Sequence, residues 1–209
     1  QLLLLEHPHV FTLGRRAVRA DVLAGPEFLA RHGVEVHDVD RGGQVTYHGP
    51  GQLVGYLIAN LRRWGGGPLQ YVRALEKALV ATLREFDIEA GSADRPTGVW
   101  VGDAKVAAIG VRISRGVTMH GFALNVDPDL SFFEQIVPCG MPDVRLSSMS
   151  ALVAGAVSVE EVVPVLGRCL GESLGWTMEW GEAACPDQTF WPNVGALGGD
   201  LPKGFRVPS

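Results

Sequence analysis

A cysteine and a lysine in this 209-residue sequence could carry out nucleophilic chemistry together. Cys139 lies between Pro138 and Gly140, directly after a short predicted helix, and both neighbours serve tight backbone geometry. As a thiolate, this side chain would attack a carbonyl carbon. The alternative is that Cys139 is a small buried hydrophobic residue, which is the usual role of a free cysteine.

Lys105 is one of only three lysines, and it lies in a stretch of small and apolar residues that runs on to Gly110. A partly desolvated lysine loses proton affinity and can act as an acid or a base near neutral pH. Its ammonium form would also favour a thiolate on a nearby cysteine. The alternative is a lysine at the end of a hairpin whose ammonium group reaches water.

The densest cluster of unusual residues begins at Arg41-Gly42-Gly43 and continues through Tyr47-His48-Gly49-Pro50-Gly51. Glycines allow backbone amides to approach a ligand closely. Arg41 and His48 bracket a predicted strand and could face one pocket, although a simple hairpin is the commoner explanation of such a glycine-rich turn.

A second candidate for ligand contact is the strand predicted around His120. A core or edge histidine with a hydrogen-bond partner is the simpler interpretation of His120 itself. Gly121 and Ala123 are small, so we expect them to leave room for an apolar ligand.

Composition excludes several classes of protein. The net charge is −5 and no basic run marks a nucleic-acid groove, so we expect no nucleic-acid partner. The apolar run Leu2–Leu5 is too short to span a membrane and lacks the basic residues of a signal peptide.

Three cysteines without a C-x-x-C motif argue against disulfides or a structural zinc site and predict a reducing, cytoplasmic environment without a metal. Cys169 follows an apolar helical pattern and is expected in the core, whereas Cys185 has no chemical context.

Hydrophobic periodicity predicts strands mixed with a few helices. The expected strands are Leu2–Leu5, Glu35–Val39, Gln44–Tyr47, Gln52–Ala59, Val99–Val101, Lys105–Ile113 and Val117–Val126. The expected helices are Asp21–His32, Pro68–Phe86, Asp129–Ile136 and Val159–Leu174. Because the strands follow one another as hairpins rather than in strict βαβ order, we predict an α/β or α+β fold of mixed, mostly antiparallel sheets with flanking helices. One domain over residues 1–209 is expected, with an irregular tail after about residue 182.

Together these motifs resemble one family, the lipoyl(octanoyl) transferases of lipoate biosynthesis. The match covers nearly all of the chain from Leu2 to about Leu174, and the last helix and the tail match poorly. It is carried by a series of ordered motifs: Leu4-Leu5-Glu6-His7-Pro8, Phe11-Thr12-Leu13-Gly14-Arg15, Arg41 to Tyr56, Gly98-Val99-Trp100, Lys105 to Gly110, His120 to Val126, and Ile136 with Pro138-Cys139-Gly140.

The resemblance implies a fold similar to the catalytic domain of biotin and lipoate protein ligases. It implies a dyad of Cys139 and Lys105 that works through an acyl-thioester on Cys139, without a cofactor. It also implies acyl-binding segments at Arg41, Gly42, Gly43, Gln44, Val45, Thr46, Tyr47 and His48, at Ala108, Ile109 and Gly110, and at Gly121, Phe122 and Ala123. The implied donor is octanoyl-acyl carrier protein. The implied acceptors are the lipoyl domains of 2-oxoacid dehydrogenase complexes and the glycine-cleavage H protein.

Three other functions remain open. An ATP-dependent lipoate or biotin ligase on the same fold would have to bind phosphates, and its lipoate branch tends to read R-R-x-S-G-G-G followed by H-D. This chain has Gly42-Gly43-Gln44 and His48-Gly49 at those places. A non-catalytic protein that binds acyl carrier protein or acyl groups would not need Cys139 and Lys105. A hydrolase would use His48 as a base and Cys139 as the nucleophile.

Overall fold

Two β-sheets organise the chain in this computed structural model, which describes residues 1–93, 95–138, 144–153, 155–181 and 204–206. The strands of the larger sheet, in spatial order, are β10 (Glu179–Gly181), β11 (Gly204–Arg206), β1 (Leu2–Leu5), β5 (Gln52–Leu57), β8 (Val117–Asn125), β7 (Ala104–Ser114) and β6 (Val99–Val101). Neighbours in that order are antiparallel, while β9 (Arg145–Leu146) pairs with β7 in parallel. The smaller sheet has the order β3 (Glu35–Asp38), β2 (Val10–Leu13), β4 (Val45–His48).

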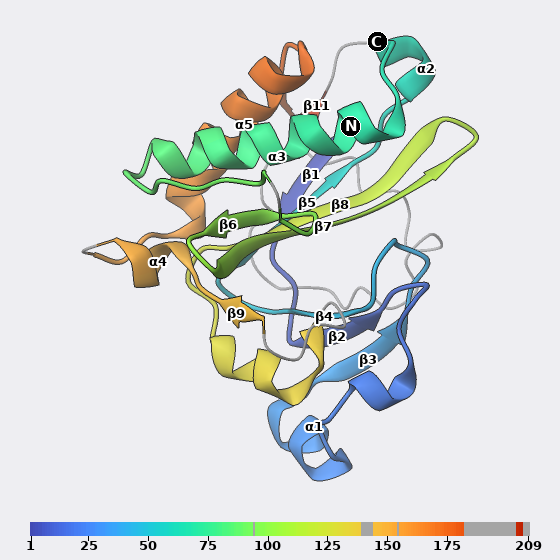
Figure 1. The fold of residues 1–209 in the computed structure, drawn as a ribbon, viewed down its shortest axis with the longest axis vertical. Coiled ribbons are helices and arrows are strands. Elements are labelled where there is room, and N and C mark those ends of the chain that lie inside the picture. The colour runs from blue at the N-terminus through green and yellow to red at the C-terminus, as the bar shows by residue number, and fades with distance from the viewer. Residues whose placement is uncertain (94, 139–143, 154, 182–203, 207–209) are drawn as a thin grey trace.

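Helices α3 (Pro68–Arg84) and α5 (Val159–Leu174) pack side by side over one face of the larger sheet (Figure 1). Pro68 suits the first turn of α3, where its missing N–H group costs nothing. Ser158 and Glu161 form the predicted capping box at the start of α5. The apolar side chains of both helices form the main core with the sheet. No helix among the described residues combines the length and the apolar character needed to cross a membrane.

The smaller sheet lies on the other side of the larger one and has a core of its own (Figure 1). Phe11 of β2 and Tyr47 of β4 are fully buried there, against Phe132. Phe132 belongs to the short helix η2 (Leu130–Gln135), whose N-cap is Asp129 as predicted. Four further short helices complete the described elements: η1 (Arg19–Asp21), α1 (Pro26–His32), α2 (Leu61–Trp64) and α4 (Met149–Leu152).

Two predicted elements differ from the structure. The helix expected at Asp21–His32 begins only at Pro26, because a residue before proline is pushed away from the helical conformation. The chain upstream is instead extended at Val22, which bridges to Ile136. The tail was expected to be irregular, yet Gly204–Arg206 forms strand β11 beside β1. Residues 182–203 and 207–209 lie outside the described residues, and the division into one domain stays a prediction.

Candidate functional site

Of the two predicted catalytic residues, the structure describes Lys105, which lies on β7 with its side chain buried. Only 4% of the residue is exposed, and its Nζ atom lies 5.4 Å from the centroid of the Trp100 ring, in a cation–π contact. Gly98 lies against the same side chain, because a Cβ atom on Gly98 would overlap the Cε atom of Lys105 and lie 3.2 Å from Nζ. The alternative interpretation, a hairpin lysine that reaches water, is therefore wrong.

Cys139 lies outside the described residues, as do Gly140 to Asp143. The chain before it is described as far as Pro138, which is buried. The chain after it forms β9, which pairs in parallel with β7 so that Leu146 lies opposite Lys105. The segment that follows Cys139 in the sequence thus joins the strand that carries Lys105, and the pairing of Cys139 with Lys105 stays a prediction.

A polar network of five residues, His48, Gln52, Asn125, Ser147 and Lys105, connects β4 to β7. The Nδ1 atom of His48 lies 2.7 Å from Oε1 of Gln52, and Nε2 of Gln52 donates to Oδ1 of Asn125 at 2.9 Å. Nδ2 of Asn125 donates to the carbonyl of Ser147 at 3.0 Å. The amide of Ser147 in turn donates to the carbonyl of Lys105 at 3.1 Å. Buried polar groups need such partners, so this network holds β9 and β7 in one arrangement.

Burial keeps the histidines of this region neutral. Burial lowers the pKa of His48 to about 3, and the nearby His7 and Arg41 lower it further, while the hydrogen bond to Gln52 opposes the shift. Burial also lowers the pKa of His7 to about 4, and its Nε2 atom lies 2.6 Å from the hydroxyl of Tyr56. A histidine that resists protonation is a poor general base, which argues against a hydrolase that relies on His48.

The loop that begins at Arg41 lies against β7. The buried guanidinium of Arg41 donates from Nη2 to the carbonyl of Thr12 at 2.7 Å and to its Oγ1 at 3.0 Å. The amide of Gly42 donates to the carbonyl of Val111 at 3.2 Å, and a Cβ atom on Gly110 would lie 3.1 Å from the carbonyl oxygen of Gly42. Two of the predicted acyl-binding segments therefore meet at Gly110.

Alternation along the strands divides the predicted acyl-binding residues between two faces. Four of them point into the cores, where they pack against other apolar side chains: Val45 and Tyr47 in the small core, and Ile109 and Phe122 in the main core. The residues between these face the opposite way: Thr46 and His48 on β4, Ala108 and Gly110 on β7, and Gly121 and Ala123 on β8. Of this second set, Ala108 and Gly110 are partly exposed, whereas the other four are buried.

Gly121 does not create the room that its size suggested. A Cβ atom there would overlap the carbonyl oxygen of Gly55, so the glycine serves the close approach of β5 and β8. His120 beside it has a φ of 60°, and its Nε2 atom lies 2.7 Å from Oδ1 of Asp40, which also pairs with Arg112. Burial, with Arg41 and Arg112, lowers the pKa of His120. The prediction that His120 is a partnered histidine is confirmed.

Cys169 is 1% exposed within the main core, as predicted, and burial raises the pKa of its thiol. A raised pKa is the opposite of what a nucleophile requires. Cys185 lies outside the described residues.

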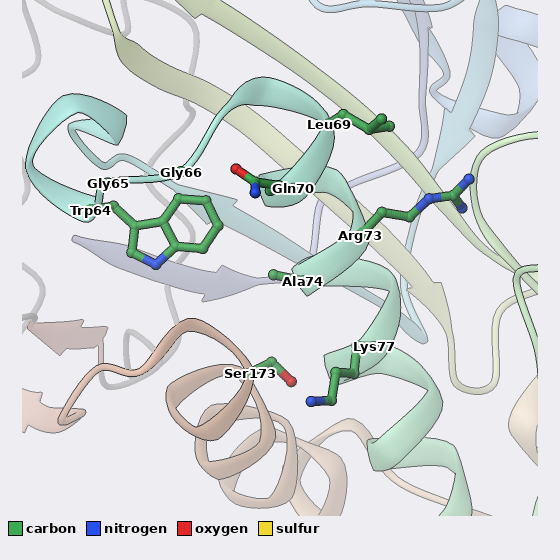
Figure 2. Close-up of a pocket in the computed structure, with 9 residues that line it drawn as sticks. All are labelled: Trp64, Gly65, Gly66, Leu69, Gln70, Arg73, Ala74, Lys77 and Ser173. Atoms are coloured by element: carbon green, nitrogen blue, oxygen red, sulfur yellow. The ribbon is translucent and has the colours of Figure 1, made fainter.

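A hollow of about 610 Å³ lies on the helical layer between α2, α3 and α5 (Figure 2). In that view Lys77 extends toward Ser173, whereas Arg73 extends away from it. The lining residues are Trp64, Gly65, Gly66, Leu69, Gln70, Arg73, Ala74, Lys77 and Ser173. None of them is a predicted site residue, so this hollow is distinct from the candidate site.

Sequence reasoning missed the roles of four residues around Lys105. Gln52 and Asn125 connect the polar network. Glu76 accepts a hydrogen bond from the amide of Gly98, which lies against the side chain of Lys105. A signal was present for Gln52 and Asn125, because each is a polar residue at one end of a strand, directly next to a run of apolar residues. Glu76 likewise falls among the buried positions of α3.

Comparisons with known proteins agree with this architecture. The family described as the lipoyl protein ligase A/B catalytic domain matches residues 1–171. An octanoyltransferase of Solibacter usitatus is 56% identical, with 77% of this chain and 72% of the relative covered. One of Acidobacterium capsulatum is 48% identical, with 87% and 80% covered. A solved lipoate-protein ligase A bound with ATP has a TM-score of 0.70 at 20% identity, covering 83% of this chain and 72% of that one. The last comparison concerns the fold alone, and it confirms the predicted fold class.

Proposed function

This chain belongs to the octanoyltransferases of the lipoyl protein ligase A/B catalytic domain family, and we propose that it moves an octanoyl group through a thioester on Cys139. It is an acyltransferase of lipoate biosynthesis. In the proposed reaction the donor is octanoyl-acyl carrier protein. The acceptor is a lysine amine of a lipoyl domain, in a 2-oxoacid dehydrogenase complex or in the glycine-cleavage H protein.

The first half of the reaction exchanges one thioester for another. The thiolate of Cys139 attacks the carbonyl carbon of the donor, a new C–S bond forms, and the C–S bond to the donor breaks. The donor leaves as a thiolate and takes a proton from the ammonium group of Lys105. Because the acyl group arrives already activated, this half needs no ATP.

The second half transfers the acyl group to nitrogen. The acceptor amine attacks the carbonyl carbon of the acyl-enzyme, a C–N bond forms, and the bond to the sulfur of Cys139 breaks. Lys105, neutral after the first half, takes the proton that the amine loses. The enzyme then returns to a thiolate and an ammonium group.

The buried position of Lys105 is the single observation that carries this proposal. The amine lies against Gly98 and Trp100, beside a strand that follows Cys139 in the sequence, and withdrawing an amine from water costs free energy that a role in the chemistry would explain. His48, the other candidate for proton transfer, resists protonation because it is buried.

The partly exposed face of β7 suits the acyl tail. Ala108 and Gly110 follow Lys105 on the same strand, and Ala123 lies opposite Ala108 on β8. Ala108 is about 10 Å along the strand from Lys105. A register shift in the pairing of β6 with β7 interrupts the alternation between these two residues, because Val106 and Ala107 both lie in the main core, so Lys105 and Ala108 can share a face along which the tail runs. Burial of six methylenes would contribute about 5 kcal/mol before the costs of binding.

Intact mass spectrometry after mixing with octanoyl-acyl carrier protein tests the proposal. The wild type should gain one octanoyl group when no acceptor is present, and hydroxylamine should remove it. Cys139→Ser should not form a hydroxylamine-sensitive adduct, and Lys105→Ala should form the adduct more slowly. A wild type that never carries the adduct would refute the acyl-enzyme.

The same samples separate the rival functions. Turnover that requires ATP and Mg²⁺ would indicate a ligase. Free octanoate released at the same rate with and without a lipoyl domain would indicate a hydrolase. Binding of the carrier protein without any covalent adduct would indicate a non-catalytic binder.

A further inference from the structure

Glu76 is a buried carboxylate that the proposed chemistry does not use. It lies on α3 with 1% of the residue exposed, among the apolar side chains that face the larger sheet. Its Oε2 atom accepts a hydrogen bond from Nη1 of Arg73 at 2.6 Å, and Arg73 is largely exposed. A carboxylate in such a place costs free energy through desolvation, and it persists only where its oxygen atoms have partners.

The second carboxylate oxygen atom of Glu76 binds the backbone segment that lies beside Lys105. Oε1 accepts a hydrogen bond from the backbone amide of Gly98 at 3.1 Å. Gly98 has a φ of 136°, a conformation that other residues rarely adopt. The carboxylate therefore holds a backbone segment that would not keep this shape by itself.

Gly98 lies directly against the side chain of Lys105. A Cβ atom there would overlap the Cε atom of Lys105, and it would also lie 2.6 Å from the carbonyl oxygen of Ala107. The Trp100 ring, two residues further along the chain, contacts the ammonium group. The place of the Lys105 side chain thus depends on where Gly98 and Trp100 are held.

We infer that Glu76 is a positioning residue for Lys105, acting through its hydrogen bond to Gly98. The side chain of Glu76 holds the segment that Lys105 packs against, and thereby places the ammonium group for proton transfer. The catalytic consequence rests on the function proposed above, whereas the placement itself does not.

Two conservative substitutions separate the hydrogen bond from the charge. Glu76→Gln keeps the length of the side chain and an acceptor oxygen for Gly98 but removes the charge. Glu76→Asp keeps the charge but withdraws the acceptor by one methylene, about 1.5 Å. If the hydrogen bond positions Lys105, the aspartate variant is the damaged one. The same pair of substitutions at Glu85, which is half exposed near the end of α3, is the matched control.

The position of Lys105 can be measured without any reaction. The sequence contains only three lysines, so NMR on protein with ¹³C-labelled lysine resolves each one, and Lys105→Arg assigns the signal that is lost. The Hε protons of Lys105 should be shifted upfield by the ring current of Trp100. Glu76→Asp should remove this shift, while Glu76→Gln and both Glu85 variants should keep it. A shift that survives in Glu76→Asp, or that both Glu76 variants lose alike, would overturn the inference.

Single-turnover acylation of Cys139 measures the consequence. Glu76→Asp should slow acylation about tenfold or more, since misplacement of a catalytic group by an ångström is costly. Glu76→Gln should stay within about threefold of wild type, because a neutral acceptor weakens the hydrogen bond without removing it. In a Lys105→Ala background Glu76→Asp should have little further effect, and an equal slowing in both backgrounds would contradict action through Lys105.

The two proposals fail in different ways. If Lys105→Ala acylates Cys139 as fast as the wild type, the proposed function is wrong, and the NMR measurement still decides whether Glu76 positions Lys105.

Discussion

Replacement of Asn125 by alanine should damage both stability and catalysis, because Asn125 is the middle of the polar network. The residue is buried, and it joins the side chain of Gln52 to the backbone of Ser147. Ser147 in turn donates to the carbonyl of Lys105. The substitution leaves Nε2 of Gln52 and the carbonyl of Ser147 without these partners.

The magnitude follows from the two groups that lose their partner. A buried polar group left unsatisfied costs about 1–3 kcal/mol, and Ser147 is only partly buried, so its contribution lies at the lower end; Asn125→Ala should therefore lower the free energy of unfolding by about 2–4 kcal/mol. For a chain of this length, the midpoint of thermal unfolding should fall by about 2–4 °C for each kcal/mol. The acylation step should slow as well, because β9 is then held less firmly beside Lys105.

Urea unfolding and single-turnover acylation are the assays. Asn60→Ala is the matched control, because Asn60 is exposed and its side chain accepts a hydrogen bond from the amide of Arg62 at the start of α2, away from the polar network. Loss of that cap should cost about 1 kcal/mol and leave acylation unchanged. If Asn125→Ala unfolds at the urea midpoint of the control and acylates at the wild-type rate, the network holds nothing in place and the reasoning is refuted.

Three further predictions concern other parts of the molecule. The free energy of unfolding should decrease as pH falls from 7 toward 4, because His7 and His48 stay neutral when folded, with pKa values of about 4 and about 3, but bind protons near pH 6.5 when unfolded. Urea unfolding at several pH values should show a slope of up to about 1.4 kcal/mol per pH unit for each histidine, and a flat profile would contradict it. Gly98→Ala should lower the thermal midpoint and slow acylation, since its φ is 136° and the new Cβ would overlap the neighbouring lysine side chain; wild-type behaviour in both assays would show that the site tolerates this overlap. Reversal of the charges at Arg62 and Arg63, both exposed, should raise the apparent KM for carrier protein, and steady-state kinetics with an unchanged KM would remove them as a docking surface.

Local signals predicted much of the fold. The apolar spacing of α3, the Ser158–Glu161 capping box and the Asp129 cap all depend on residues within a few positions of one another, and each prediction agrees with the structure. Strands β2, β9 and β10 were missed although the equally short β1 and β6 were predicted, so length alone does not explain the difference. Such short strands exist through pairing with distant segments, which periodicity within a window does not detect.

The sequence singled out candidate site residues, but it did not predict the direction in which each of their side chains points. The segment from Arg41 to His48 was singled out whole, but alternation sends Val45 and Tyr47 into the small core. Gly121 was expected to leave room, yet its missing side chain accommodates the backbone of a neighbouring strand. Whether a glycine opens a pocket or permits a close approach depends on a segment far away in the sequence.

The polar network limits how protons can move in this site. Between its two ends, Gln52 and Asn125 take part through side-chain amides and Ser147 through its backbone, and none of these groups gains or loses a proton near neutral pH, so they can orient other groups but cannot transfer a charge. His48 at one end resists protonation because it is buried. The network therefore fixes the backbone at Lys105, while proton exchange with a substrate falls to the Lys105 side chain itself. His48 and Lys105 are thus both buried at the ends of one network, but His48 has a structural role and only Lys105 is proposed to react.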